Sequence, residues 1–399
     1  MNKVYITDFG AGEGVLNNAE AIQAAIDGCA AGGTVVIPAG TFVSGAIKLC
    51  GNMTLYLEKG AVLQGSGDCR DYEKHASRGW RDYDSLWFDA FICAEDAENV
   101  NIEGEGTIDG VDCFNPKGEE GFRGPHCMRF VRCKNMRISG LHIKRSANYA
   151  MFFINSSNLS VDNVSVCGGH DGIHSHNCNN AVVSGCDFRT GDDCVAGSDN
   201  INFMIRDCKF NTSCNGFRLG CLNLTAERCQ FWGPGEFLHL SQKRNNMLCA
   251  IIHFSPPDRN PLLPSGNWQL DDITADNCET LYHVARSEPW QSGQPVFTVK
   301  FENTRATNIE RPVTVADERR DTALSFKDSS IELRPGITGK SVIKCDGFDS
   351  LELKNVKLAG NAGAPAVDIC DGNRASFENT GILAVDIRAE NIKSANFLS

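Results

Sequence analysis

Three aspartates recur at a fixed spacing in the middle of the chain. The motifs that carry them, 22 residues apart, are Gly169-His170-Asp171-Gly172 and Gly191-Asp192-Asp193-Cys194, followed after another 22 by Ser213-Cys214-Asn215-Gly216. Crowded carboxylates repel, so at least one of them should have a raised pKa and keep its proton. A protonated acid beside an ionised base is the pair that hydrolysis of a glycosidic bond requires. Asp171, Asp192 and Asp193 are therefore the candidate catalytic residues.

The same aspartates also have a structural interpretation. Asp-Gly pairs are common in turns, where the carboxylate binds backbone N–H groups or a structural cation. The shared spacing favours the catalytic interpretation, because it predicts Asp171, Asp193 and Asn215 in one column with Asp192 beside Asp193.

The spacing belongs to a longer repeat that predicts the fold. Apolar residues close similar segments at intervals of 23, 22, 22 and 21 positions, at Ile143, Val166, Phe188, Phe210 and Phe231. Asparagines recur in step, at Asn158, Asn180 and Asn202. A repeat of about 22 residues with alternating apolar positions is typical of one coil of a parallel β-helix. We therefore predict an all-β fold: a single-stranded right-handed parallel β-helix, with residues 1–399 as one domain.

Three stretches depart from the repeat. A short helix is predicted over 17–31, where Asn17-Asn18 precede an Ala- and Ile-rich stretch, and we expect it to cap the open end of the β-helix. Residues 69–90 and 243–270 are expected to form irregular loops over the cleft. Four tryptophans are candidates for stacking on sugar rings, namely Trp80, Trp87, Trp232 and Trp290.

Composition narrows the class of protein. The formal net charge is −12, which gives no general attraction to nucleic acid or anionic membranes, and no long apolar segment predicts a membrane span. The 19 cysteines include no Cys-x-x-Cys pair, and the N-terminus lacks the regions of a signal peptide. We therefore expect a cytoplasmic protein without a disulfide framework. Cys186, Cys208 and Cys229 are interpreted as small buried hydrophobes.

Polar side chains around the aspartates are candidate substrate ligands. Arg218 falls in register over His174, with Ala196 between them, and could bind a carboxylate or a hydroxyl group or be a solvated surface arginine. The other candidates are Asn215, His170, His174, His239, Lys243 and Arg244. His170, His174 and His176 match no familiar metal-binding spacing, so we expect no metal site and no cofactor.

Two motifs carry a resemblance to a known family. Thr190-Gly191-Asp192-Asp193-Cys194 is similar to a Gly-Asp-Asp-Cys motif, and the opening from Asp8 to Ala61 is similar to that of bacterial members. The chain resembles the polygalacturonase family, glycoside hydrolase family 28, over most of its length. The resemblance implies that Asp192 is the general acid, that Asp171 and Asp193 hold the attacking water, and that the anomeric carbon is inverted.

The sequence departs from the family pattern at two places. Asn215 stands where the family has a histidine, and no Arg-Ile-Lys motif follows to bind the substrate carboxylate. We predict a glycosidase, exo-acting on a pectin-like or related oligosaccharide. The alternatives are a polysaccharide lyase, epimerase or sugar transferase on the same scaffold, or a carbohydrate-binding β-helix without catalysis.

Overall fold

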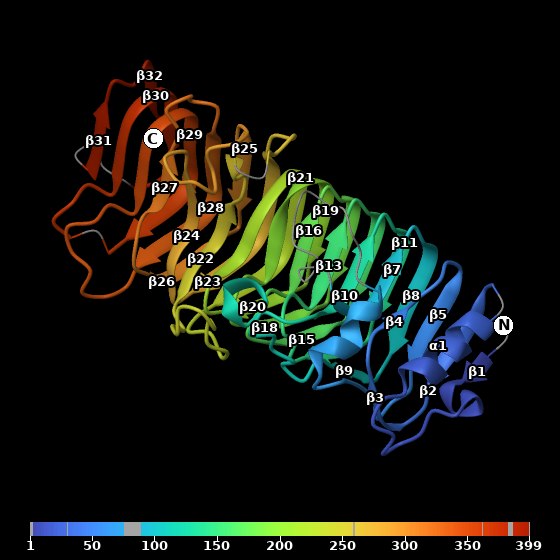
Figure 1. Cartoon of the computed structure of the whole chain (residues 1–399). Helices are drawn as coiled ribbons and strands as arrows, with labels where there is room; N and C mark the ends of the chain where they lie inside the picture. Colours follow the sequence, from blue (N-terminus) through green and yellow to red (C-terminus); the bar gives the residue numbers. More distant parts are fainter. Residues whose placement is uncertain are drawn as a thin grey trace. The chain divides into compact units, whose positions relative to one another are not determined.

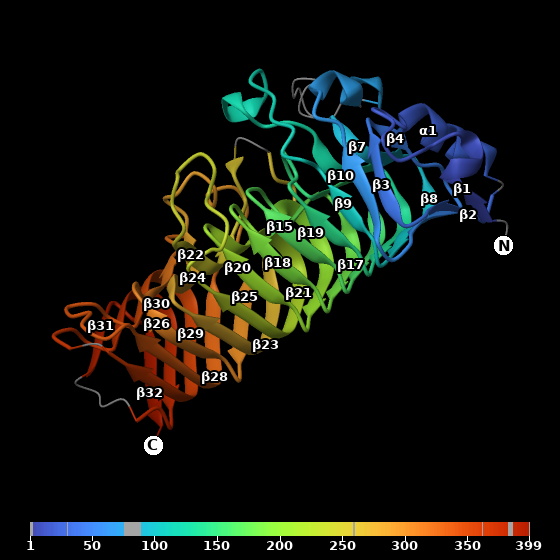
Figure 2. The same cartoon turned by 90° about the horizontal axis from the view of Figure 1, so that it is seen from below.

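The computed structural model describes residues 3–29, 31–75, 89–257, 260–360, 362–381 and 386–398. The chain divides into two compact units: unit 1 is Met1–Asp192 with Phe237–Lys243, and unit 2 is Asp193–Glu236 with Arg244–Ser399. Each unit is built almost entirely from parallel strands (Figures 1 and 2). The prediction of one domain stays a prediction.

Unit 1 contains eighteen strands, one α-helix and short 3-10 helices among its described residues. The strands are β1 (Lys3–Tyr5), β2 (Gly33–Ile37), β3 (Gly40–Ser44), β4 (Ile47–Lys48), β5 (Met53–Leu57), β6 (Ala61–Gly65), β7 (Ala90–Glu95), β8 (Glu98–Gly104), β9 (Thr107–Asp109), β10 (His126–Val131), β11 (Lys134–Ser139), β12 (His142–Lys144), β13 (Met151–Ile154), β14 (Ser157–Asp162), β15 (Ser165–Gly168), β16 (Ile173–His176), β17 (Asn179–Ser184) and β18 (Asp187–Thr190). The helices are η1 (Ile6–Phe9), α1 (Ala19–Gly28), η2 (Cys69–His75) and η4 (Glu119–Gly121).

Three strands make one coil, and each pairs in parallel with its counterpart in the next coil. Strands β10, β11 and β12 pair with β13, β14 and β15, which pair in turn with β16, β17 and β18. Ile143 pairs with Val166 and Val166 with Phe188, so the predicted apolar column is confirmed in this unit. All three side chains are buried, because alternate residues of each strand point into the coil.

Asparagines form a ladder at the bends of unit 1. Asn135, Asn158 and Asn180 have φ values of 57, 56 and 58°, a left-handed conformation that asparagine tolerates better than most residues. The Nδ2 of Asn158 donates to Oδ1 of Asn135 at 2.9 Å, and Asn180 donates likewise to Asn158 at 3.2 Å. The bend conformation and the amide ladder together explain why asparagine recurs at the coil spacing.

The N-terminal helix is confirmed at α1, shorter than the predicted 17–31. Its buried face consists of Ile22, Ala25 and Ile26. The side chain of Gln23 donates to the Lys48 carbonyl at 3.0 Å and accepts from the Lys48 N–H at 2.8 Å. The helix is therefore fixed to β4 by a strand-like pair of hydrogen bonds, beside the first strands of unit 1 (Figure 2).

Unit 2 contains fourteen strands among its described residues. They are β19 (Val195–Arg206), β20 (Lys209–Thr212), β21 (Asn215–Trp232), β22 (Met247–His253), β23 (Gly266–Asp276), β24 (Cys278–Ala285), β25 (Thr298–Glu302), β26 (Arg305–Ile309), β27 (Val313–Ala316), β28 (Ala323–Leu333), β29 (Ile343–Ala359), β30 (Val367–Glu378), β31 (Ile387–Glu390) and β32 (Ser394–Leu398). The pairing is again parallel, with Phe210 opposite Phe231 and Ala196 opposite Arg218, as the repeat predicts. The all-β prediction and the parallel β-helix are thus confirmed.

The predicted loop over 243–270 is wrong for much of its length. Residues 247–253 form β22 and β23 begins at Gly266, so the described irregular part between these strands is only 254–257 and 260–265. The prolines of this stretch predict a loop, but the apolar run Met247–Ile252 forms a mostly buried strand that continues the coil. In the predicted loop 69–90, Cys69–His75 form η2, and Trp80 and Trp87 lie outside the described residues.

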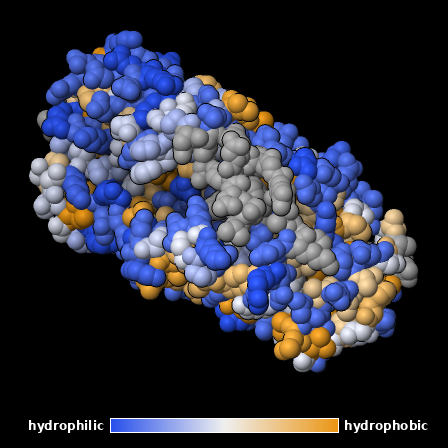
Figure 3. Space-filling view, viewed as in Figure 1, coloured by the Kyte–Doolittle hydropathy of each residue, from blue (hydrophilic) through white to orange (hydrophobic). Residues whose placement is uncertain are grey.

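The described surface is mainly polar. Hydrophilic residues dominate the face drawn in Figure 3, and hydrophobic residues occur there in scattered groups. Within the described ranges, no helix has the length and apolar character to cross a bilayer. Cys186, Cys208 and Cys229 are buried, as predicted, and all 19 cysteines of the chain are free thiols.

Candidate active site

Asp171 is a buried carboxylate of unit 1. Its Oδ2 lies 2.6 Å from Nδ1 of His174, and Nε2 of His174 lies 3.1 Å from Nε2 of His176. A neutral imidazole that donates from Nδ1 accepts at Nε2. The consistent arrangement is therefore a relay in which His176 donates to His174 and His174 donates to Asp171.

His174 is buried and hydrogen-bonded to Asp171. The imidazole stacks on the Tyr149 ring at 4.1 Å with an interplanar angle of 8°, and the residue has no exposed surface. A ring with no exposed surface does not touch a sugar, so the predicted substrate contact of His174 finds no support here. We assign His174 to positioning Asp171 and setting its hydrogen bond.

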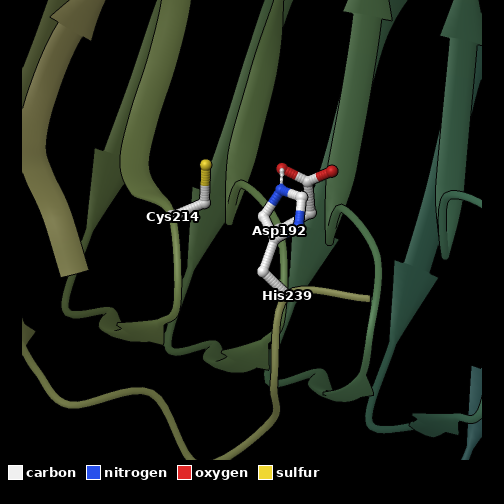
Figure 4. A group of neighbouring side chains, drawn as sticks. All are labelled: Asp192, Cys214 and His239. Carbon is white, nitrogen blue, oxygen red and sulfur yellow. Dashed lines mark ion pairs between the residues drawn. The ribbon is translucent and has the colours of Figure 1, made fainter. Parts of the chain in front are cut away.

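Asp192 lies between two cationic or donor groups of unit 1. Its Oδ2 lies 3.2 Å from Nη2 of Arg123, and its Oδ1 lies 3.6 Å from Nε2 of His239 (Figure 4). Nδ1 of His239 accepts from the N–H of Gln242 at 3.2 Å, which leaves the proton of the neutral ring on Nε2. His239 therefore turns an N–H toward Asp192. The Asp192 side chain is 14% exposed, against 1% for Asp171.

Two glycines explain how His239 reaches Asp192. A Cβ on Gly169 would lie 2.6 Å from the Leu240 side chain, and a Cβ on Gly191 would collide with the Leu238 carbonyl oxygen. Segment 237–243 thus rests on the two positions that precede the aspartate motifs. Glycine is required there because only its bare backbone admits so close an approach.

Asp171 and Asp192 form a close carboxylate pair. One oxygen of each lies within 4.8 Å of the other. Like charges this close resist ionising together, so we expect the pair to retain one proton over part of the pH range. Asp192 is the more exposed member, which suits the group that must reach a glycosidic oxygen.

His170 is a buried neutral imidazole beside this pair. It is 3% exposed and stacks on Phe122 at 5.7 Å. Burial, reinforced by the positive charge of Arg123, lowers its pKa to about 3. Its Nε2 has no hydrogen-bond partner among the described residues. The structure therefore places His170 near Arg123, in a mostly buried position rather than on an open surface.

Asp193 is the buried carboxylate of unit 2. Its Oδ1 accepts from Nδ2 of Asn215 at 2.8 Å, and its Oδ2 accepts from Nε of Arg218. The guanidinium of Arg218 also lies 4.1 Å from the centre of the Phe254 ring. Asn215 and Arg218 belong to β21, so the coil register places both on Asp193. Arg218 is thus neither a solvated surface arginine nor an uncommitted substrate ligand.

The remaining candidates are more dispersed. Arg244 donates to the carbonyl oxygens of Ser213 and Asn246 within unit 2, and Lys243 is exposed in unit 1. Trp290 is 41% exposed and Trp232 is half-buried at the end of β21.

Sequence reasoning missed Arg123. It lies in the loop between β9 and β10, 69 positions before Asp192, outside any coil register. The available signal was local: Arg123 follows Gly121-Phe122 and precedes Gly124-Pro125, a turn-rich setting in which an arginine can project from a loop. Tyr149, the platform for His174, was missed too.

Part of the chain matches a known protein family. Residues 30–220 match the family model described as "Glycosyl hydrolases family 28". A probable polygalacturonase of Arabidopsis thaliana is 28% identical over 83% of this chain and 65% of its own length. The exo-poly-alpha-D-galacturonosidase of Dickeya chrysanthemi is 26% identical over 48% of this chain and 41% of its own length. The matches thus span less than two thirds of these relatives.

A solved structure supports the fold. The exopolygalacturonase of Thermotoga maritima superposes with a TM-score of 0.70 at 20% identity, covering 89% of this chain and 91% of that chain. At this identity the likeness concerns the β-helix alone. Residues 30–220 are thus similar to glycoside hydrolase family 28, the polygalacturonase family, and the described structure shares the parallel β-helix of the exopolygalacturonase.

Proposed function

We propose that the protein hydrolyses galacturonide bonds in pectin-like oligosaccharides. The observation that carries the proposal is the pair of close carboxylates in unit 1, Asp171 and Asp192, with unlike surroundings. The names of the Arabidopsis and Dickeya relatives support galacturonide as the sugar.

The reaction needs one proton donor and one activated water. In this proposal Asp192 passes its proton to the glycosidic oxygen as the bond to the anomeric carbon breaks. Asp171 and Asp193 orient the water and one of them, Asp193, takes its proton. The products are two shorter sugars, and Asp193 returns its proton to Asp192 through solvent.

We propose inversion at the anomeric carbon and removal of sugars from a chain end. Inversion follows from the family resemblance, and exo action from the activity in the name of the Dickeya relative. Proton NMR of the first product formed from trigalacturonate tests inversion, because the β-anomer must appear before mutarotation. Chromatography of hexagalacturonate digests tests exo action: monomer or a single short product should precede intermediate sizes.

The deciding experiment is Asp192→Asn, assayed on trigalacturonate. Loss of the acid should lower kcat by about 1,000-fold or more, with an unchanged circular dichroism spectrum. The matched control is Asp187→Asn, because Asp187 is a half-exposed carboxylate of unit 1 that pairs with Arg189. Normal turnover by Asp192→Asn contradicts the proposal. An unsaturated product from the wild type would identify a lyase, and binding without turnover would identify a carbohydrate-binding protein.

A further inference from the structure

The guanidinium of Arg123 is buried and surrounded by acceptors. Arg123 is 8% exposed. Its Nε lies 3.3 Å from Glu120 and 3.8 Å from Glu119, its Nη1 lies 3.3 Å from Asn148, and its Nη2 lies 3.2 Å from Asp192. Burial alone would lower the pKa of Arg123, but Tyr149 and the nearby carboxylates outweigh burial and raise it. Arg123 is therefore a permanent positive charge beside the acid.

These contacts are long for a charged group. Charge-assisted N–H···O bonds are commonly about 2.7–2.9 Å, and arginine binds a carboxylate best through two parallel N–H groups. None of these contacts is shorter than 3.2 Å, and none of the three carboxylates accepts from two of its N–H groups. The guanidinium is thus held in place while its preferred bidentate partner is missing among the described residues.

The pairing also conflicts with the role of Asp192. An adjacent guanidinium favours the ionised carboxylate, typically by about 1–3 pKa units. A general acid must instead carry a proton when the substrate is bound. A second anion on Arg123 would remove this opposition and add to the repulsion from Asp171, which already favours a proton on the pair.

We propose that Arg123 binds the carboxylate of a uronide substrate, which replaces Asp192 on the guanidinium and so allows Asp192 to take up the proton that it donates. This inference rests on the proposed function and deepens it. It gives the site a carboxylate ligand that the missing Arg-Ile-Lys motif would otherwise supply. It also makes the charge of the sugar a condition for catalysis, because a neutral sugar leaves Asp192 paired and ionised.

The surroundings of Arg123 suit such an exchange. Arg218 is committed to Asp193 in unit 2, whereas Arg123 and Asp192 belong to unit 1. His170, which stacks on Phe122, is neutral because its pKa is lowered to about 3 by burial first and by Arg123 second. A neutral imidazole does not compete with Arg123 for an anion.

The test compares a charged substrate with its neutral form. We would measure kcat/KM of Arg123→Gln on trigalacturonate and on fully methyl-esterified trigalacturonate. The expected loss is about 100-fold on the acid, whereas turnover of the ester should stay the same or rise, because the variant leaves Asp192 unpaired from arginine with either substrate. Arg123→Lys keeps the positive charge but lacks the planar guanidinium, so its kcat/KM on trigalacturonate should lie between those of the wild type and Arg123→Gln. Arg132→Gln is the matched control, because Arg132 is a half-exposed arginine of unit 1 that pairs with Glu95 and Asp96.

The pH profile separates this role from a structural one. The profile of kcat/KM reports the free enzyme and that of kcat reports the complex. Activity should fall at high pH as Asp192 loses its proton. In the wild type this fall should occur at least about one pH unit lower in the kcat/KM profile than in the kcat profile, because Arg123 pairs with Asp192 only in the free enzyme. Arg123→Gln should close this gap, because Asp192 is then unpaired from arginine in both states.

The outcomes are distinguishable from failure of the proposed function. Two results would overturn the exchange at Arg123: an equal loss of kcat/KM by Arg123→Gln on both substrates, or an unchanged difference between its two pH profiles. If Asp192→Asn is inactive in the same assays, the proposed hydrolase activity is still supported. If Asp192→Asn remains active, the proposed function itself fails. If Arg123→Gln does not fold, Arg123→Lys decides by the same two measurements.

Discussion

Asp192 and Asp193 are consecutive in the chain, yet their surroundings are opposite. Asp193 has no exposed side-chain surface and is held by Asn215 at 2.8 Å and by Arg218, both on strand β21. Asp192 is 14% exposed, and its partners Arg123 and His239 come from loops, at 3.2 and 3.6 Å.

The contrast separates a fixed carboxylate from one that can change partner. The parallel hydrogen-bond ladder fixes the backbone of β21, so Asn215 and Arg218 project toward Asp193 from defined positions. Loop residues carry fewer such constraints, and long contacts cost less to exchange. Partners held on a strand, as around Asp193, suit a general base. Partners held on loops, as around Asp192, suit a general acid that must gain and lose a proton.

The largest expected effect comes from removing the fixed carboxylate. Asp193→Asn should lower kcat on trigalacturonate by about 1,000-fold or more, because the water loses its base. Asp193→Ala should also destabilise the protein by about 3 kcal/mol in urea unfolding, since it leaves the half-buried Arg218 without its counter-charge. Steady-state kinetics and urea denaturation at pH 7 measure both.

A control from the same unit makes this specific. Asp207→Asn removes an exposed carboxylate that pairs with Arg228, and it should leave kcat and stability nearly unchanged. Comparable stability in Asp193→Ala and Asp207→Asn would contradict the view that Asp193 is locked.

The second effect concerns the relay behind Asp171. His174→Gln removes the ring that donates at 2.6 Å to Asp171 and stacks on Tyr149. Misplacement of Asp171 should lower kcat by about 100-fold with KM little changed, because the sugar does not touch this position. A rise in KM at constant kcat would instead assign His174 to substrate binding.

How far the sequence predicts each setting follows from the same physics. The coil repeat fixes which residues meet across parallel strands, so it predicted the apolar columns, the asparagine ladder and the stacking of Asn215 over Asp193. It could not predict Arg123 or the exact place of His239, because loop residues obey no register. The sequence did not predict strand β22 either. The prolines that follow it are typical of loops, and a strand of seven residues is too short to show the coil repeat by itself.

The third effect probes the register at Asn215. Asn215→Ala should lower kcat by about 10-fold, since Asp193 then lacks the N–H that Asn215 donates to its Oδ1. Asn215→His returns the residue type that the family pattern has at this position, and its ring N–H can donate to the same oxygen. We expect Asn215→His to stay within about 3-fold of the wild type. Equal losses in the two variants would show that the volume of the side chain matters and its N–H does not.

The smallest effect is thermodynamic and compares one buried histidine from each unit. Burial lowers the pKa of His170 to about 3, with Arg123 contributing, and burial alone lowers the pKa of His253 to about 3. In the unfolded chain both titrate near pH 6.5. Between these values the unfolded state binds more protons, so stability is full above about pH 6.5 and falls as the pH drops toward 3.

Each histidine should contribute at most about 1.4 kcal/mol per pH unit to this slope. Urea unfolding at pH 7.5, 6.0 and 5.0 should therefore show a shallower slope in His170→Gln and in His253→Gln than in the wild type, and the shallowest in the double variant. His142→Gln is the control, because His142 is an exposed histidine of unit 1. A slope that does not change in either variant would mean that the buried rings accept protons as readily in the folded protein as in the unfolded chain, and the neutral setting inferred around Arg123 would lose its support.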